Sequence, residues 1–342
     1  MEFFNNNLAE LWLLLIAFFL LFYALTDGAD LGIGMLTLIT RDLKERQAMM
    51  GTIETIWHGN QTWLVILGGM LFGAFPLFYS IVLSALYIPF TLMLFGLIFR
   101  GVAFEFHANS PRKSLWMFSF GIGSLLTTLG QGFALGGLLC GITVENSEFA
   151  GHPLDWVNWY SVVAAAGVLC VYLMLGSSFL IARTTGVLRE RSHRAAAYAG
   201  IFTFLISGAI ISFTTGLYEE IAAKWAAWPR SPLPLFILFA MAGFFMFFRS
   251  LRLKKQLAPL VWSRLIILFT FTELSIGFYP NMIPSVATTS LTVQDVAASP
   301  VTLKFMLATT AILLPVILVY TSYSYWIFRG KKSTGHGTGN KY

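Results

Sequence analysis

The stretch LAELWLLLIAFFLLFYALT, residues 8–26, decides the fold of this chain. Glu10 is its only charged residue, and a further apolar segment continues to Ile39. An α-helix rises about 1.5 Å per residue, so about 20 apolar residues cross the hydrocarbon core of a bilayer, which is roughly 30 Å thick. The stretch therefore predicts a membrane-spanning helix.

Eight further apolar runs follow along the chain. They lie at residues 57–76, 79–99, 115–140, 159–181, 198–217, 234–248, 261–279 and 303–328. Of the 342 residues, 57% are hydrophobic and only 11% are charged, and the mean hydropathy is +0.73. A soluble domain would have about a quarter charged residues. We therefore expect an all-α integral membrane protein with about nine transmembrane helices.

The basic residues predict the orientation, because Lys and Arg are retained on the cytoplasmic side of a membrane. With the N-terminus outside, only Lys224, Arg230 and Lys304 of the 22 basic residues lie on the outer side. The other 19 lie in inner loops, at inner helix ends or in the tail, namely Arg41, Lys44, Arg46, Arg100, Arg112, Lys113, Arg183, Arg189, Arg191, Arg194, Arg249, Arg252, Lys254, Lys255, Arg264, Arg329, Lys331, Lys332 and Lys341. We therefore expect an outer N-terminus and a cytoplasmic C-terminus. The net charge of +6 then reflects topology and attraction to anionic lipid, not nucleic-acid binding.

No polar stretch is long enough to separate two folded domains, so residues 1–330 are expected to form a single polytopic transmembrane domain. Residues 331–342 are rich in Gly and Lys and are expected to be a disordered cytoplasmic tail. Cys140 and Cys170 lie in apolar runs without a CxxC pattern or a nearby His cluster. Neither a disulfide framework nor a metal site is predicted.

Polar residues inside membrane helices are costly, so they mark candidate functional sites. The densest group follows the first run, where Asp27 and Asp30 are three residues apart and therefore face the same side of a helix. Gly28 and Gly32 form a small-xxx-small pair, which lets another helix approach closely. A proton-holding pair is one interpretation. The alternative is that one Asp caps a helix or pairs with an Arg at the interface.

A second polar group opens the next run, at WHGNQTWL, residues 57–64. It places Trp57, His58, Asn60 and Gln61 at the start of an apolar helix. Buried carboxamides are satisfied only by specific partners, so a packed polar network is expected here.

A third group, RGVAFEF at residues 100–106, carries Arg100 and Glu105. They are five residues apart, a poor spacing for a helical pair, so each is expected to contact a different helix. The predicted topology gathers the three groups at the cytoplasmic leaflet, namely Asp27, Asp30, His58, Asn60, Gln61, Arg100 and Glu105. Such a cluster suits proton uptake from the cytoplasm, and a purely structural polar plug is the alternative.

Three other features lie within the apolar runs. Glu273 is about twelve residues into the run 261–279, so it is expected to be protonated, paired or next to water, with function and structure equally open. Gln131 lies among glycines, which indicates close helix packing. Gly69 and Gly73 form another candidate close-packing pair.

Several stretches of the sequence resemble subunit II of the cytochrome bd-type quinol oxidases, heterodimeric respiratory enzymes that reduce dioxygen to water. They are TDGADLGIGML at 26–36, WHGNQTWLVILGGMLFGAFPLFY at 57–79, FRGVAFEF at 99–106, FYPNMIPSVATTSLTVQDVAASPVTLKFM at 278–306 and VILVYTSYSYW at 316–326. They occur in the order expected for the family and span both ends of the chain. Residues 114–255 resemble the family mainly in hydropathy.

The resemblance implies two four-helix bundles plus one peripheral helix in a bacterial cytoplasmic membrane. It also implies a similarly folded partner, subunit I, which holds the b- and d-type hemes and the quinol site, and a small single-helix accessory subunit. This chain would then bind no heme and would not be catalytic alone. Its histidines are His58, His107, His152, His193 and His336. Only His58 lies within a predicted membrane helix, and it lacks a partner at comparable depth. Whether a structural quinone or lipid binds this subunit is left open.

The resemblance carries roles over to Asp27, Asp30, Trp57, Asn60, Gln61, Trp63 and Glu105. Together with the polar residues described above, the candidate proton path comprises Asp27, Asp30, His58, Glu105 and Glu273, supported by Trp57, Asn60, Gln61 and Arg100. Glu273 is unusual for the family and is a candidate from its position alone. Trp63 is the candidate for dioxygen access. Many family members have Asp where this chain has His58, and a histidine can still carry protons near neutral pH.

Two alternative functions make different demands on the sequence. An autonomous ion or solute transporter would need a substrate cavity near the membrane midplane, whereas the polar groups other than Glu273 gather at one leaflet. A self-contained heme oxidase would need axial His or Met pairs, which cannot be assembled from this sequence.

Overall fold

The computed structural model describes residues 7–285 and 290–327, and this part of the chain is almost entirely helical. The helices are α2 (Leu8–Ile39), α3 (Leu43–Gly51), α4 (Trp57–Ala74), α5 (Pro76–Ala85), α6 (Tyr87–Asn109), α7 (Lys113–Cys140), α8 (Trp159–Arg183), α9 (Gly186–Leu217), α10 (Glu219–Ala226), α11 (Leu233–Arg252), α12 (Ala258–Phe278), α13 (Val293–Val296) and α14 (Pro300–Ile327). Two short antiparallel hairpins pair β1 (Val144–Glu145) with β2 (Glu148–Phe149), and β3 (Asn281–Ile283) with β4 (Leu291–Thr292). The predicted tail, residues 331–342, lies outside the described residues.

Eight of the described helices are long and apolar enough to cross a membrane, and a ninth crossing is obtained only if α4 and α5 count as one broken span. The sequence pattern predicted a continuous span at 57–76 followed by one at 79–99. Instead, α4 ends at Ala74, the chain turns by 117° at Phe75, and α5 begins with Pro76 at its first position. Proline lacks a backbone N–H and clashes within a helix, but it fits the first helical turn. The α4–α5 break therefore lies where Pro76 favours a new helix start.

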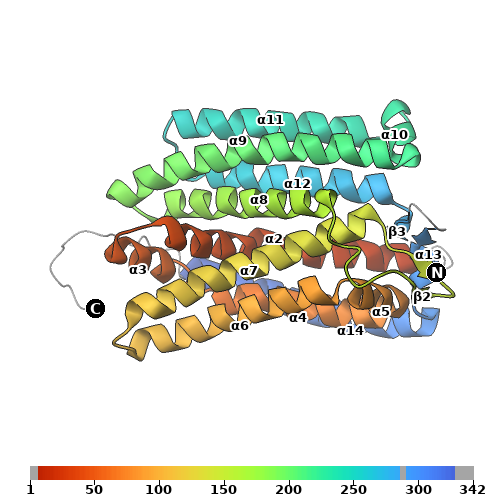
Figure 1. The fold of residues 1–342 in the computed structure, drawn as a ribbon, viewed down its shortest axis with the longest axis horizontal. Helices are drawn as coiled ribbons and strands as arrows, with labels where there is room; N and C mark the ends of the chain where they lie inside the picture. The colour runs from red at the N-terminus through yellow and green to blue at the C-terminus, as the bar shows by residue number, and fades with distance from the viewer. Residues whose placement is uncertain (1–6, 286–289, 328–342) are drawn as a thin grey trace.

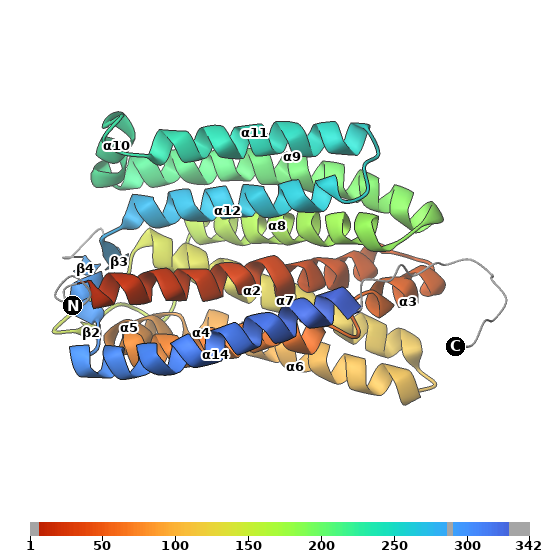
Figure 2. The ribbon, with the colours of Figure 1, turned by 180° about the vertical axis from the view of Figure 1, so that it is seen from behind.

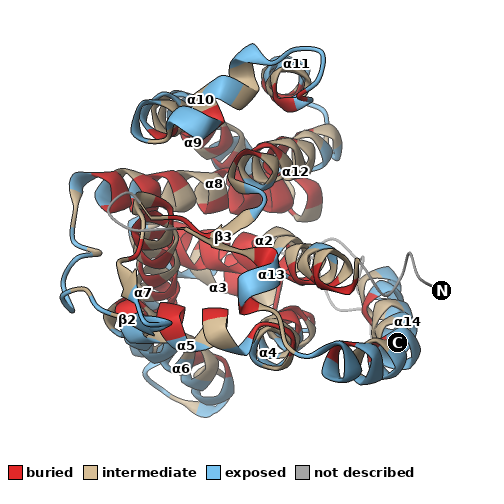
Figure 3. Ribbon diagram, turned by 90° about the vertical axis from the view of Figure 1, so that its right-hand side faces the viewer, coloured by how far each residue is buried: buried red, intermediate tan, exposed pale blue. Residues whose placement is uncertain are grey.

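The helices lie side by side along one axis, with α2 in the middle of the molecule (Figures 1 and 2). α2 packs against α4, α7 and α8, while α6 packs on α7, α9 on α8, and α11 on α12. α14 contacts α4 and α2 at the edge and is largely exposed. Seen end-on, buried residues concentrate where α2, α7 and α8 meet (Figure 3).

A close crossing of α2 and α8 depends on glycine. A Cβ atom at Gly32 would lie 1.8 Å from the backbone oxygen of Tyr172, and one at Gly176 would lie 2.6 Å from the backbone nitrogen of Ile33. The prediction that Gly28 and Gly32 let a helix approach is confirmed, because Gly28 faces the Tyr172 ring. The corresponding prediction for Gly69 is wrong within the described residues, because no atom lies within 4 Å of its Cβ position.

The two ends of the bundle differ in charge. At one end α2 stops at Ile39, α3 follows, α8 stops at Arg183 and α12 begins at Ala258 (Figure 1). We call this the basic end, because the loops and helix ends there carry Arg41, Lys44, Arg46, Arg112, Lys113, Arg183, Arg189, Arg191, Arg194, Arg249, Arg252, Lys254 and Lys255. The opposite end carries α10, α13 and the two hairpins (Figures 1 and 2).

Candidate functional site

The centre of the candidate site is an ion pair between α2 and α6. Arg100 donates from Nη1 to Oδ2 of Asp27 at 2.8 Å and from Nη2 to Oδ1, so the ion pair is bidentate. Both side chains are 0% exposed. Asp27 lies twelve residues before the end of α2, or about 18 Å from the basic end along the helix. Two opposite charges are therefore held together deep in the bundle.

Asp30 is a second carboxylate beside the same cation. Its Oδ2 lies 3.7 Å from Nη2 of Arg100 and accepts a hydrogen bond of 2.8 Å from Nδ2 of Asn60. Its Oδ1 is buried and has no hydrogen-bond partner among the described residues. The prediction that Asp27 and Asp30 face the same side of the helix is confirmed, because both contact Arg100.

Asn60 connects this group to α14. The hydroxyl of Tyr325 donates to Oδ1 of Asn60 at 2.9 Å, while Nδ2 of Asn60 donates to Asp30. Asn60 is 0% exposed and uses both ends of its carboxamide. The packed polar network expected around the carboxamides is therefore confirmed for Asn60. Gln61 is only half-buried and makes no hydrogen bond to a described residue, so the structure leaves it outside this network.

The network also continues in the other direction, toward α7 and α8. The Tyr23 hydroxyl interacts electrostatically with Asp27 and accepts a hydrogen bond of 2.6 Å from Nε2 of Gln131. The Tyr172 hydroxyl donates to Oε1 of Gln131 at 2.8 Å. The interpretation of Gln131 as mere helix packing was incomplete, because its carboxamide joins two tyrosines.

The network thus comprises Tyr325, Asn60, Asp30, Arg100, Asp27, Tyr23, Gln131 and Tyr172. Its three tyrosines, Tyr325, Tyr23 and Tyr172, were not predicted from the sequence. A signal was available, because a tyrosine buried in a membrane helix needs a hydrogen-bond partner for its hydroxyl.

His58 and Glu105 lie outside the network and on the surface. Both side chains are exposed, and the centroid of the His58 ring lies 3.6 Å from the ring centroid of Trp57. Trp57 is buried and stacks on Phe104 of α6, with ring centroids 4.7 Å apart. The expectation that Arg100 and Glu105 contact different partners holds for Arg100, which turns inward to α2.

Trp63 lies in an aromatic cluster about one helical turn after Asn60 in α4. Its ring is 0% exposed, and its centroid lies 4.3 Å from that of Phe22 and within 6.3 Å of those of Phe18 and Phe19. The indole N–H has no partner among the described residues. The side chain is therefore packed entirely by apolar groups.

Glu273 stands apart from the ion pair. It is 5% exposed in α12, and its Oε2 has no hydrogen-bond partner in the described chain. No described contact joins it to Asp27 or Asp30, so its place in a proton path stays a prediction.

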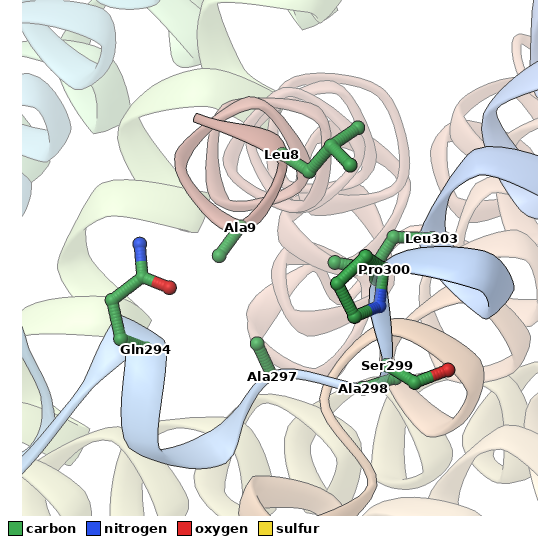
Figure 4. Close-up of a pocket in the computed structure, with 8 residues that line it drawn as sticks. All are labelled: Leu8, Ala9, Gln294, Ala297, Ala298, Ser299, Pro300 and Leu303. Atoms are coloured by element: carbon green, nitrogen blue, oxygen red, sulfur yellow. The ribbon is translucent and has the colours of Figure 1, made fainter. Parts of the chain in front are cut away.

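A pocket opens at the opposite end of the molecule, between the start of α2, α13 and the start of α14 (Figure 4). It is lined by Leu8, Ala9, Gln294, Ala297, Ala298, Ser299, Pro300 and Leu303. Gln294 donates to Glu10 at 2.7 Å beside it. None of the predicted site residues lines this pocket. Within residues 7–285 and 290–327, no three His, Cys, Asp or Glu side chains are grouped so that they could hold a metal ion.

The comparisons with known proteins agree with this architecture. Residues 8–328 match the family described as cytochrome bd terminal oxidase subunit II. The chain is 29% identical to cytochrome bd-I ubiquinol oxidase subunit 2 of Escherichia coli (strain K12), over 94% of each chain. It is 27% identical to cytochrome bd ubiquinol oxidase subunit 2 of Bacillus subtilis (strain 168), over 96% of this chain and 97% of that one.

The fold is similar to a chain in the structure of the bd oxidase from Geobacillus thermodenitrificans, with a TM-score of 0.71 and 16% identity, covering 94% of this chain and 98% of that chain. The family match spans almost the whole described chain, including every helix of the polar network. This multi-pass membrane protein therefore belongs to the cytochrome bd terminal oxidase subunit II family.

Proposed function

We propose that this chain is the heme-free subunit II of a bacterial quinol:dioxygen oxidoreductase of the cytochrome bd type. In this role it assembles with and stabilises a heme-bearing subunit I in the inner membrane, and it supplies that subunit with protons from the cytoplasm. The proposed role in proton supply is supported by one observation: the guanidinium of Arg100 is buried beside two carboxylates, those of Asp27 and Asp30.

The charges of this arrangement allow it to hold a proton. The positive charge of one guanidinium balances the negative charge of one carboxylate, and Arg100 already forms a bidentate ion pair with Asp27. An arginine stays charged in proteins. A second buried negative charge on Asp30 would be costly in a low dielectric, so Asp30 is the position at which a proton binds and leaves.

The proposed route runs from the basic end, which we place in the cytoplasm because Lys and Arg are retained there. From that side, Tyr325 near the end of α14 donates to Asn60, and Asn60 donates to Asp30. The three residues form an unbroken series of hydrogen bonds between α14, α4 and α2. The Asn60 carboxamide does not itself carry the proton. In the proposed route, Asn60 and the Tyr325 hydroxyl orient the Asp30 carboxyl and line the path along which water brings a proton to it.

Subunit I is proposed to cover the exposed faces of α4 and α6. We define the α4–α6 surface by His58, Thr62, Val65 and Phe72 of α4 and by Leu94, Ile98, Val102 and Glu105 of α6, all of which are exposed. Most of these side chains are apolar. His58 and Glu105 are not, and lipid would solvate them poorly, whereas a protein partner can hydrogen-bond them. They are the proposed points at which protons pass to the partner.

The hemes and the quinol are assigned to that partner. A buried heme needs axial ligands from within the bundle, whereas the described histidines lie at helix starts and ends, in a loop or in the first turns of α9. His58 and His152 are exposed, and His107 and His193 are half-buried near the basic end. These positions support the proposal that the oxidase chemistry takes place in subunit I.

We further propose that the helices divide into one bundle of α2, α4, α6 and α7 and another of α8, α9, α11 and α12, with α14 peripheral and a single-helix accessory subunit outside them. The contacts of α6 with α7, α8 with α9, and α11 with α12 support this division. Trp63 is proposed to lie on the dioxygen path, supported by its apolar aromatic surroundings.

The test is Asp30→Asn in the assembled complex, measured as oxygen consumption with quinol. We expect slower turnover with an unchanged heme absorption spectrum, because the amide keeps the shape but cannot carry the proton. The matched control is Asp295→Asn, a mostly exposed aspartate at the opposite end that caps α13 through Thr292. If Asp30→Asn turns over like the wild type, the network is structural, and if Glu105→Gln does so, Glu105 is not a point of proton transfer. Heme or oxidase activity in the purified lone chain would contradict the assignment as subunit II.

A further inference from the structure

A second cation in a membrane helix, Arg264, is half-buried and makes no ion pair with a described residue. It lies in the second turn of α12, six residues after Ala258 or about 9 Å into the helix from the basic end. The ion pairs between described residues are those of Arg100 with Asp27 and Asp30 and of Arg191 with Glu45. Arg264 takes part in none of them, and its Nε is buried without a hydrogen bond.

An unpaired guanidinium at this position is costly. Arginine cannot lose its proton to become neutral, so it needs either water or an anion to balance its charge. Tertiary packing around Arg264 supplies no carboxylate within ion-pair distance among the described residues. A negatively charged group from outside this part of the chain would balance this charge.

Arg183 adds a second positive charge beside it. It closes α8, and its guanidinium lies over the Phe179 ring at 5.3 Å from the centroid. Nε2 of Gln256, two residues before α12, donates to the backbone oxygen of Ala182 at 3.0 Å, which places the start of α12 beside the end of α8. Arg183 and Arg264 are close enough to interact electrostatically with each other and with the Tyr325 hydroxyl. Two neighbouring positive charges attract an anion. A phosphate group suits this position, because its oxygens accept the paired N–H donors of guanidinium groups.

The surroundings favour a phosphate that carries acyl chains. Leu257, the residue just before α12, and Val261 in its first turn precede Arg264 at helical spacing, and they are 64% and 51% exposed. Apolar side chains beside an arginine near a helix end match the boundary between lipid headgroups and acyl chains. An acidic peptide would have to enter the bilayer to reach the same position.

We infer that Arg264 and Arg183, next to Tyr325, form a binding site for the phosphate of one anionic phospholipid between α8, α12 and α14 at the basic end. The lipid lies beside the first hydrogen bond of the polar network, because Tyr325 donates to Asn60. The negative charge of the bound lipid lowers the positive electrostatic potential at Tyr325.

The test uses the complex as purified from membranes, stripped of lipid and placed in phosphatidylcholine nanodiscs. Short-chain phosphatidylglycerol is titrated and counted by native mass spectrometry, with inorganic phosphate as a separate arm. We expect one phosphatidylglycerol to bind selectively, and Arg264→Gln to weaken this binding about tenfold through the loss of charged hydrogen bonds. Arg264→Lys keeps the positive charge but loses the planar set of guanidinium N–H donors, so this variant should bind phosphatidylglycerol with intermediate affinity.

The matched control is Arg252→Gln, an exposed arginine at the same end, which should bind like the wild type. Unchanged affinity in Arg264→Gln overturns the inference, and so does equal binding of phosphatidylcholine and phosphatidylglycerol. Inorganic phosphate binding as tightly as phosphatidylglycerol overturns the lipid assignment in favour of free phosphate. If Arg264→Gln does not assemble, the selectivity of the wild type and the affinity of Arg264→Lys decide the question.

Discussion

Arg100 of α6 binds both carboxylate oxygens of Asp27 of α2, although the two residues are 73 positions apart in the chain. Neither side chain is exposed, so the contact holds two helices together in a place where water does not compete. Because Asp30 lies beside the same guanidinium, the contact also sets the charge of the proposed proton site. Stability and function therefore depend on the same three side chains.

Breaking this ion pair should destabilise the subunit strongly. Arg100→Gln leaves Asp27 and Asp30 without a cation, and the loss of one partner from a buried pair costs about 3–5 kcal/mol. We expect a large fall in the melting temperature of the complex and in its yield. The control is Arg191→Gln, whose partner is Glu45 and whose side chain is 52% exposed, and which should change stability by less than about 1 kcal/mol. Equal effects of the two changes would contradict the central role of Arg100.

The hydrogen bond between Tyr325 and Asn60 should matter for turnover more than for assembly. Tyr325→Phe removes one hydroxyl from the proposed route and keeps the ring, so we expect several-fold slower oxygen consumption with normal heme content. Tyr320→Phe is the matched control, because Tyr320 lies on the same helix and is 62% exposed. A Tyr325→Phe complex as fast as the control would remove α14 from the route.

The crossing of α2 and α8 should not tolerate a methyl group at Gly32. Gly32→Ala would bring its Cβ atom against the backbone of Tyr172, which cannot move without shifting α8, so we expect a loss of about 1–3 kcal/mol. Gly208→Ala on α9 meets no atom within 4 Å and should gain up to about 1 kcal/mol from helix propensity. Thermal unfolding of the two variants measures the difference, and a neutral Gly32→Ala would refute the close crossing.

Glu273→Leu should stabilise the protein. The carboxyl is buried in α12 with one oxygen unpartnered, and an apolar side chain of similar size removes that cost. Because no described contact links Glu273 to Asp30, we expect unchanged turnover and a higher melting temperature. Slower turnover in both Glu273→Leu and Glu273→Gln would instead make Glu273 part of a proton path.

The helices could be predicted from the sequence because burial in lipid requires long apolar runs, whatever their neighbours. The exception is residues 57–85, where the run is as apolar as the others but Pro76 starts a new helix after a sharp turn. Hydropathy averages over such a break. The proline itself was the local signal for it.

The polar site could be predicted only in part, because hydropathy does not report how each helix is rotated. Asn60 points inward to Asp30, while Gln61 is one residue further on, about 100° around the helix, and misses the network. Glu105 follows Arg100 by five residues, or about 140° around α6, so it faces outward when Arg100 faces α2. The pairing of Tyr23 and Tyr172 through Gln131 depends on three helices at once and has no local pattern.

Glu105 provides the last prediction, which concerns the proposed contact with subunit I. It is exposed in this chain, and so is Glu190 on α9, which lies near the same end but away from the α4–α6 surface. In a background with Cys140 and Cys170 replaced by alanine, Glu105→Cys and Glu190→Cys are each treated with a maleimide in the assembled complex. Labelling is read by peptide mass spectrometry. If subunit I covers the α4–α6 surface, Glu105→Cys reacts several-fold more slowly than Glu190→Cys, and the difference disappears in the lone chain. Equal rates in the complex would place the partner on another face, and His58 and Glu105 would then need lipid headgroups or water to satisfy them.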